Sequence, residues 1–244
     1  MPARADNRFP ASPRLTGTVS GMVRSQAEES DISHWLAALR DHDEVTYQHS
    51  IHLAELVAGF AAFLGLARIH QLYLIRAALL HDVGKITIPR ELLAKTGLID
   101  AREYEHLRSH AEAGFVMLMS GTGLPAEIID VVRHHHEKLD GSGYPDGLIA
   151  YQIAPAVRLV TICDIYAALT EHRPYRTPLK PAEALTEMES LHGQLDSMLL
   201  MQFRLFILRS HSLRQRMLSL LRGMTTHWLP GAAWITQRRM QSSH

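Results

Sequence analysis

The stretch His81-Asp82-Val83-Gly84-Lys85-Ile86 decides the fold, because it places an imidazole beside a carboxylate at the end of an apolar segment with helical periodicity. Adjacent residues on a helix point about 100° apart. Both side chains can therefore face one metal cluster only near the helix end, and Gly84 permits the helix to end there. A carboxylate in that position can bridge two cations, and Lys85 can reach an anionic phosphate. A lone His-Asp pair is more often a cap or a surface group, so the rest of the chain decides its meaning.

Further imidazoles and carboxylates recur once per helix-sized segment, with gaps of about 25 to 32 residues. A zinc finger collects its ligands from one short loop, whereas this spacing predicts an all-α bundle whose facing helices each contribute inward side chains. A set without thiolates favours Fe, Mn or Zn in a hydrolytic site. The candidate metal ligands are His49, His81, Asp82, His110, His135, His136 and Asp164.

The composition predicts one sizeable globular domain, because 244 residues with 46% hydrophobic side chains can supply a buried core. The longest weakly interrupted apolar stretch, Leu56 to Ala67, is too short to span a membrane. The first residues show no signal-peptide pattern, so a cytoplasmic protein is expected. Cys163 is the only cysteine, which excludes an intrachain disulfide.

The charges are distributed unevenly along a chain whose formal net charge is zero. All 25 acidic residues lie at or before Asp196. An arginine-rich end can contact an acidic partner, RNA or an anionic surface, but a solvated helix face is the more common explanation of such a pattern. The arginines after Asp196 are Arg204, Arg209, Arg214, Arg216, Arg222, Arg238 and Arg239.

The pattern of apolar residues and breakers divides the chain into three parts. Residues 1–30 are predicted to be a flexible N-terminal lead, 31–210 a helical domain, and 211–244 a basic C-terminal tail. Three glycines and a proline in Asp140-Gly141-Ser142-Gly143-Tyr144-Pro145-Asp146-Gly147 require a tight loop beside the histidine run. Helices are expected at 31–40, 43–65, 69–83, 100–119 with Asp100 as its N-cap, 125–136, 155–171, 181–191 and 197–208, the last continuing as 213–221, and a short helix is expected to begin at Pro89.

Taken together, the stretch 81–86, the run His135-His136-Glu137 and the loop 140–147 resemble the HD-GYP family of cyclic di-GMP phosphodiesterases within the HD superfamily. The resemblance covers about 155 of the 244 residues and rests on long motifs in the right order. It also includes Thr46 with His49-Ser50, the run Ala168-Leu169-Thr170, the run Arg173-Pro174-Tyr175-Arg176, and Gly193 with Asp196.

This resemblance implies an all-α, HD-superfamily helical bundle with a dinuclear metal site between its helices. The two divalent cations are expected to be Fe or Mn, with Zn, Ni and Co as alternatives, and Asp82 is the expected bridge. The ligands carried over are the seven named above, and Asp82 and Lys85 are the expected catalytic residues. The expected substrate-binding residues are Lys85, Gly143, Tyr144, Pro145, Arg173 and Arg176.

Some assignments stay open at the level of sequence. His134 is expected to pack beside the site, because three successive helical residues span about 200° and cannot all face one cluster. The rival assignment takes His134 with His135 as ligands. Arg173 and Arg176 can instead form caps or surface salt bridges, and Tyr144 can belong to a purely structural loop.

Several positions depart from the family pattern. Val45 stands where trinuclear members carry a glutamate, so a dinuclear site is expected. Ala167 replaces a usual aspartate and His52 a frequent arginine, while Ala150 and Ala154 alter the segment after the loop. None removes a predicted ligand, but the absent carboxylate at Ala167 is expected to loosen the support of the metal site, which can cost tenfold or more in metal affinity or rate.

The expected function is hydrolysis of cyclic di-GMP to pGpG, with GMP as a further product, lowering this bacterial second messenger. One alternative keeps the metal site and changes the substrate to another nucleotide, because site chemistry transfers less reliably than fold. The other alternative is a catalytically weak domain that binds cyclic di-GMP or a signalling protein. A diguanylate cyclase domain and a second copy of the chain are candidate partners, and no DNA partner is expected.

Overall fold

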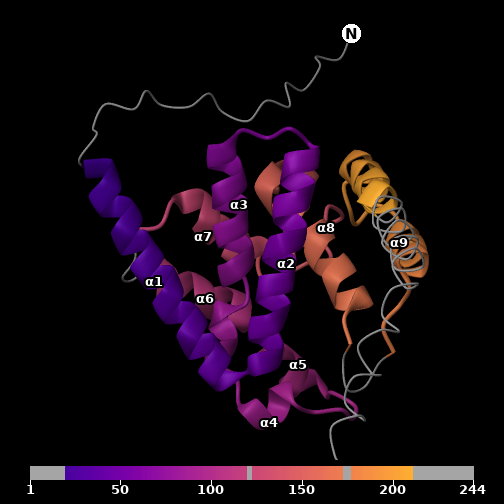
Figure 1. The fold of residues 1–244 in the computed structure, drawn as a ribbon. Helices are drawn as coiled ribbons and strands as arrows, with labels where there is room; N and C mark the ends of the chain where they lie inside the picture. Colours follow the sequence, from indigo (N-terminus) through magenta and orange to yellow (C-terminus); the bar gives the residue numbers. More distant parts are fainter. Residues whose placement is uncertain (1–19, 120–122, 173–176, 211–244) are drawn as a thin grey trace, which may run out of the picture.

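The computed structural model describes residues 20–119, 123–172 and 177–210, and within these ranges the chain is all-α, as predicted (Figure 1). The only β-type pairing there is an isolated bridge between Asp140 and Ile149, which closes the glycine-rich loop. Residues 197–210 form a last helix. The other helices are α1 (Ser20–His42), α2 (Glu44–Phe63), α3 (Arg68–Leu80), η1 (Val83–Thr87), α4 (Arg90–Leu93), α5 (Ala101–Arg108), α6 (His110–Met119), α7 (Ala126–His134), η2 (Ala150–Gln152), α8 (Pro155–Thr170) and α9 (Pro181–Ser190).

Helices α2 and α3 form the centre of the bundle and run side by side in opposite directions (Figure 1). Asp43 caps α2, because its carboxylate accepts a hydrogen bond from the Thr46 backbone N–H at 3.1 Å. Gly65, with a φ of 70°, makes the turn between the helices. Helix α3 ends at Leu80, three residues before the predicted end, so His81 and Asp82 lie just beyond the regular helix.

The hydrophobic core lies among α2, α3, α7 and α8, and the helix 197–210 packs against it through aromatic rings. The ring of Phe203 lies 5.0 Å from that of Phe60 in α2 and 5.2 Å from that of Tyr166 in α8, both in edge-to-face geometry. In the described part of the chain, no helix has the length and apolarity needed to cross a bilayer.

Besides the end of α3, two predictions about the helices were wrong. Helix α1 begins at Ser20 and so extends into the segment 1–30, because residues 22–30 contain no glycine or proline and are rich in helix-forming side chains. The predicted helix 100–119 is two helices that meet at Ser109, whose hydroxyl donates to the His106 carbonyl at 2.7 Å and competes with the regular backbone pattern. The predicted N-cap at Asp100 is present as a complete capping box with Glu103. The predicted tail 211–244, and with it the continuation 213–221, lies outside the described residues.

Candidate metal centre

Side chains from five helices or helix ends meet at one place in the bundle. His49 lies within α2, Asp164 within α8, and His110 is the first residue of α6. The remaining four follow the ends of α3 and α7. The seven predicted ligands form three overlapping groups, in each of which the candidate ligand atoms lie within 4.8 Å of one another: Asp82, His110, His135 and His136; His49, His81 and Asp82; His81, His135 and Asp164.

Three of the imidazoles are held in the same way by the backbone. The Nδ1 atoms of His81, His110 and His135 each lie within hydrogen-bond distance of the carbonyl oxygen three residues earlier. A carbonyl oxygen only accepts, so Nδ1 carries the hydrogen and each neutral ring keeps its lone pair on Nε2. The backbone thus prepares these rings to bind a cation through Nε2. The carbonyls belong to Ala78 (2.8 Å), Leu107 (2.6 Å) and Val132 (2.9 Å).

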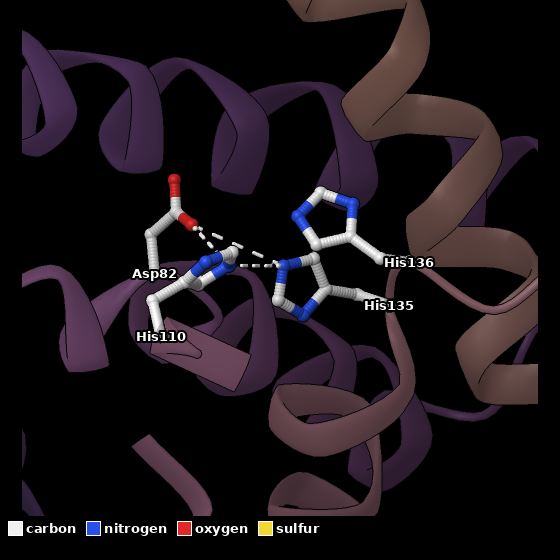
Figure 2. Close-up of side chains that lie close together, drawn as sticks. All are labelled: Asp82, His110, His135 and His136. Atoms are coloured by element: carbon white, nitrogen blue, oxygen red, sulfur yellow. Dashed lines mark hydrogen bonds and ion pairs between the residues drawn. The ribbon is translucent and has the colours of Figure 1, made fainter. Parts of the chain in front are cut away.

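Asp82 lies at the centre of the cluster and is buried. Its Oδ2 atom accepts from the Lys85 ammonium at 2.7 Å and lies 3.1 Å from His81 Nε2. Its Oδ1 atom lies 3.2 Å from His110 Nε2 and 3.9 Å from His135 Nε2 (Figure 2). Burial alone would raise the pKa of Asp82, but His81 and Lys85 hold this pKa well below its ordinary value. The carboxylate is therefore ionised and shared between two groups of imidazoles.

Several nitrogen and oxygen atoms of the cluster lack a suitable hydrogen-bond partner within the protein, so the cluster can be tested for its fit to divalent cations. The Nε2 atoms of His110 and His135 face each other at 3.3 Å although both carry lone pairs. His81 Nε2 and Asp82 Oδ1 are buried without a hydrogen-bond partner. Burial lowers the pKa of His110, lowers that of His135 well below its ordinary value, and lowers that of His136 to about 3, so these rings are neutral. Neutral imidazoles around an ionised carboxylate fit divalent cations.

His49 is held differently, because both of its ring nitrogens face carboxylates. Its Nε2 atom lies 2.9 Å from Asp164 Oδ1, and its Nδ1 atom lies 2.7 Å from Glu171 Oε2. Burial opposes the charge on His49, but the hydrogen bonds to Asp164 and Glu171 outweigh it and raise its pKa to about 9. A cation that binds Nε2 must therefore displace a proton.

Tyr144 from the glycine-rich loop lies against the cluster. Its ring centroid is 4.6 Å from that of His136 and 6.5 Å from that of His110. The guanidinium carbon of Arg108 lies 4.6 Å from the same tyrosine ring, in cation–π geometry. The Nε atom of Arg108 is buried and has no hydrogen-bond partner. An aromatic ring and a cationic side chain thus border the candidate metal centre.

The sequence profile of the HD domain family matches residues 35–199, which include all seven clustered candidate ligands. The chain belongs to the HD domain family. This result confirms the family membership predicted from the histidine motifs. Among relatives, the HD domain is 37% identical over 176 residues to a protein of Pseudomonas aeruginosa named cyclic di-GMP phosphodiesterase, covering 70% of this chain and 41% of the relative.

Two further relatives define the range of similarity. The HD domain is 37% identical over 156 residues to a Vibrio cholerae protein named 3'3'-cGAMP-specific phosphodiesterase 1, covering 63% of this chain and 36% of the relative. The solved HD domain of the phosphodiesterase PgpH from L. monocytogenes has a TM-score of 0.53 at 18% identity, covering 73% of this chain and 97% of that one. This likeness confirms the HD fold. The chain spans less than half the length of the two named curated relatives.

The loop that carries Tyr144 is anchored to the rest of the HD domain through its backbone. A Cβ atom on Gly143 would lie 2.4 Å from the Lys138 backbone nitrogen, so only glycine fits this approach. The buried Glu137 carboxylate accepts the backbone N–H groups of residues 146, 147 and 148 at 2.7, 3.0 and 3.0 Å. Gly143 therefore serves packing in this structure, and its predicted contact with substrate stays a prediction.

His134 lies outside all three ligand groups of the HD domain. Its Nδ1 atom lies 2.7 Å from Asp130 Oδ1, and its Nε2 atom lies 2.8 Å from Asp146 Oδ2 in the loop. Of this histidine run, only His135 and His136 belong to a group of candidate ligands in the described residues, and the rival choice of His134 with His135 gains no support from the geometry. Two of the predicted substrate-binding residues border the cluster, because Lys85 contacts Asp82 and Tyr144 contacts His136. Pro145 is the next residue of the same loop. Arg173 and Arg176 lie outside the described residues.

Sequence reasoning missed the parts played by Arg108, Glu137 and Glu171. Glu137 directly follows the histidine pair and lies three residues before the loop 140–147, and this position could have indicated its contact with the loop. Arg108 precedes His110 by two residues and gave no signal, because most arginines are exposed. Glu171 lies two helical turns after Asp164, and this spacing on α8 is the signal that it faces the same side.

Proposed function

We propose that this HD domain is a metal-dependent phosphodiesterase that hydrolyses cyclic di-GMP to linear pGpG. The observation that carries the proposal is the buried Asp82 carboxylate shared by two groups of imidazoles, with Lys85 and Tyr144 beside it. The similarity to phosphodiesterases supports the same reaction class.

The proposed cofactor is a pair of divalent cations, Fe or Mn first, with Zn, Ni and Co as alternatives. When bound, such cations acidify a water molecule and neutralise negative charge on phosphoryl oxygens. His110, His135 and His136 would hold one cation, His49 and His81 the other, and Asp82 would be shared. Asp164 would complete the second set, because its Oδ1 lies 2.9 Å from His49 Nε2 and 4.0 Å from His81 Nε2. All donors are imidazole or carboxylate groups, which these metals accept.

The chain's own residues supply substrate binding and orientation in this proposal. Lys85 keeps its ammonium group beside Asp82, with 24% of its side chain exposed, so it can contact a phosphate at the edge of the cluster. Arg108 has a buried, unpartnered Nε and lies over the Tyr144 ring, which places a second cation where a dinucleotide phosphate would approach. Arg173 and Arg176 are proposed to complete the binding site.

A second candidate substrate is 3'3'-cGAMP, which differs from cyclic di-GMP in one base. The similarity to a protein named as specific for 3'3'-cGAMP favours this candidate. Both substrates carry the same phosphodiester ring, so the metal centre alone does not choose between them.

The test is an anaerobic assay of the purified protein loaded with Fe²⁺ or Mn²⁺, using cyclic di-GMP, 3'3'-cGAMP and cyclic di-AMP in parallel. We expect linear pGpG by chromatography, with a further GMP peak if hydrolysis continues. Asp82→Asn should lower the rate by at least about 100-fold, because it removes the shared anionic ligand. Asp41→Asn, at a side chain 77% exposed, is the matched control. Absence of any linear dinucleotide with both metals would refute the proposal.

A further inference from the structure

Glu171 connects two histidines of α2 to the end of α8. One oxygen of its carboxylate lies 2.7 Å from His49 Nδ1, and the other lies 2.6 Å from His52 Nδ1. His49 and His52 are three residues apart on the same helix, so they present neighbouring side chains. The backbone N–H of Glu171 donates to the Ala167 carbonyl at 2.9 Å and fixes the residue at the C-terminus of α8.

This contact makes His49 unlike the three imidazoles that the backbone holds. The Nδ1 atoms of His81, His110 and His135 bond to backbone carbonyls three residues earlier, and no side-chain substitution removes those acceptors. His49 Nδ1 depends instead on a side chain 122 residues away. A substitution of Glu171 alone can therefore change the orientation of the His49 ring.

The same contact bears on the carboxylate absent at Ala167. Ala167 is fully buried in α8, and Glu171 lies four residues later, so the two positions lie on one face of that helix. Asp164 also lies on this face and contacts the opposite nitrogen of His49. Helix α8 thus brings two carboxylates to His49 without using position 167.

We propose that Glu171 is a positioning residue for the metal ligand His49, and that Glu171 with His52 supplies the support that Ala167 lacks. The inference rests on the proposed function, because it takes His49 as a ligand of one cation. A carboxylate bonded to Nδ1 fixes the tautomer and the ring orientation and makes Nε2 a better ligand. Glu171 belongs to none of the ligand groups in the described residues, so its part is orientation and not coordination.

The experiment measures metal binding by the 244-residue chain, with Mn²⁺ alone as the probe. Titration calorimetry and elemental analysis should give two cations for the wild type. Glu171→Ala should keep the cation held by His110, His135 and His136 and weaken the other by about 10 to 100-fold. A general loss of structure would not weaken one of two cations selectively. Glu187→Gln, at an exposed carboxylate of α9, is the matched control and should bind as the wild type does.

Further variants separate positioning from folding. Glu171→Gln has the same size and should weaken the same cation if Glu171→Ala folds poorly by circular dichroism. His52→Ala should reduce the affinity of that cation by a smaller factor, because it frees one oxygen of Glu171, and His52→Arg should restore it by keeping a donor there. Wild-type affinity for both cations in Glu171→Gln and Glu171→Ala, in a wild type that binds two Mn²⁺ and hydrolyses cyclic di-GMP, would overturn this inference alone. A wild type that binds neither Mn²⁺ nor Fe²⁺ and forms no linear dinucleotide would overturn the proposed function with it.

Discussion

Gly84→Ala should damage both stability and the metal centre, because the backbone of η1 passes directly against α6. A Cβ atom on Gly84 would lie 2.0 Å from the His110 carbonyl oxygen and 2.5 Å from the Gly114 backbone nitrogen. Contacts of a Cβ atom shorter than 3.0 Å are essentially never observed, so the segments must separate by about 1 Å. The added methyl group would meet backbone atoms, which cannot move aside as a side chain can. We therefore expect a loss of unfolding free energy at the upper end of the usual range for overpacking, about 3 kcal/mol.

The separation of η1 from α6 would also move His110, which is a candidate metal ligand. His110 Nε2 lies 3.2 Å from Asp82 Oδ1, and metal–ligand distances tolerate deviations of only about 0.2 Å. We therefore expect at least about tenfold weaker Mn²⁺ binding in Gly84→Ala, together with a melting temperature roughly 6 to 12 °C lower at this chain length.

Calorimetric melting and Mn²⁺ titration of the metal-free protein measure both effects. Gly97→Ala is the matched control, because a Cβ atom there meets nothing within 4 Å and the residue has no positive φ. A Gly84→Ala protein with the melting temperature and Mn²⁺ affinity of Gly97→Ala would refute the packing argument.

Three further predictions follow from other contacts. Glu137→Gln should lower the unfolding free energy by about 1 to 3 kcal/mol and raise the rate of hydrogen exchange at residues 146–148. Both carboxylate oxygens of Glu137 accept N–H groups there, whereas the NH₂ group of a glutamine amide cannot accept. Unchanged exchange rates would contradict this prediction. Hydrogen bonds from Arg133 and His134 lower the pKa of Asp146 from 3.8 to about 2, so its contribution to stability is present above pH 3.8 and is lost as the pH falls through about 2. Urea unfolding of the metal-free protein should show a steeper loss over this window than Asp146→Asn does, and equal slopes would count against the ion pairs. Mn²⁺ at 100 times its Kd should raise the wild-type unfolding free energy by about 2.7 kcal/mol for each bound cation. The same Mn²⁺ concentration should stabilise Asp82→Asn much less, and an equal rise in both proteins would exclude Asp82 as a ligand.

Local sequence signals predicted the elements that depend on local chemistry. The N-cap at Asp100 was visible because a side-chain oxygen acts within a few residues, and Gly84 indicated a helix end near His81, although the predicted end lay three residues too late. The regular spacing of imidazoles predicted their meeting, because each helix brings one face to the core. The break at Ser109 was missed, since a serine inside a helical pattern is compatible with an unbroken helix.

The partners of the site residues were decided by packing between distant segments. The spacing of Glu171 from Asp164 indicates a shared face of α8, but the contact of Glu171 with His49 depends on how α8 lies against α2. The tight approach of η1 to α6 likewise appears in sequence only as two glycines, Gly84 and Gly114, whose contact the sequence does not show.

The sequence by itself determined the helical class, the HD family and the set of seven candidate ligands, because residue type and periodicity fix which groups exist and which face they occupy. Only the tertiary structure decided that His49 is oriented by Glu171 and that three other imidazoles are oriented by backbone carbonyls. Orientation depends on hydrogen bonds of about 3 Å, and such distances between remote residues are set when the helices pack.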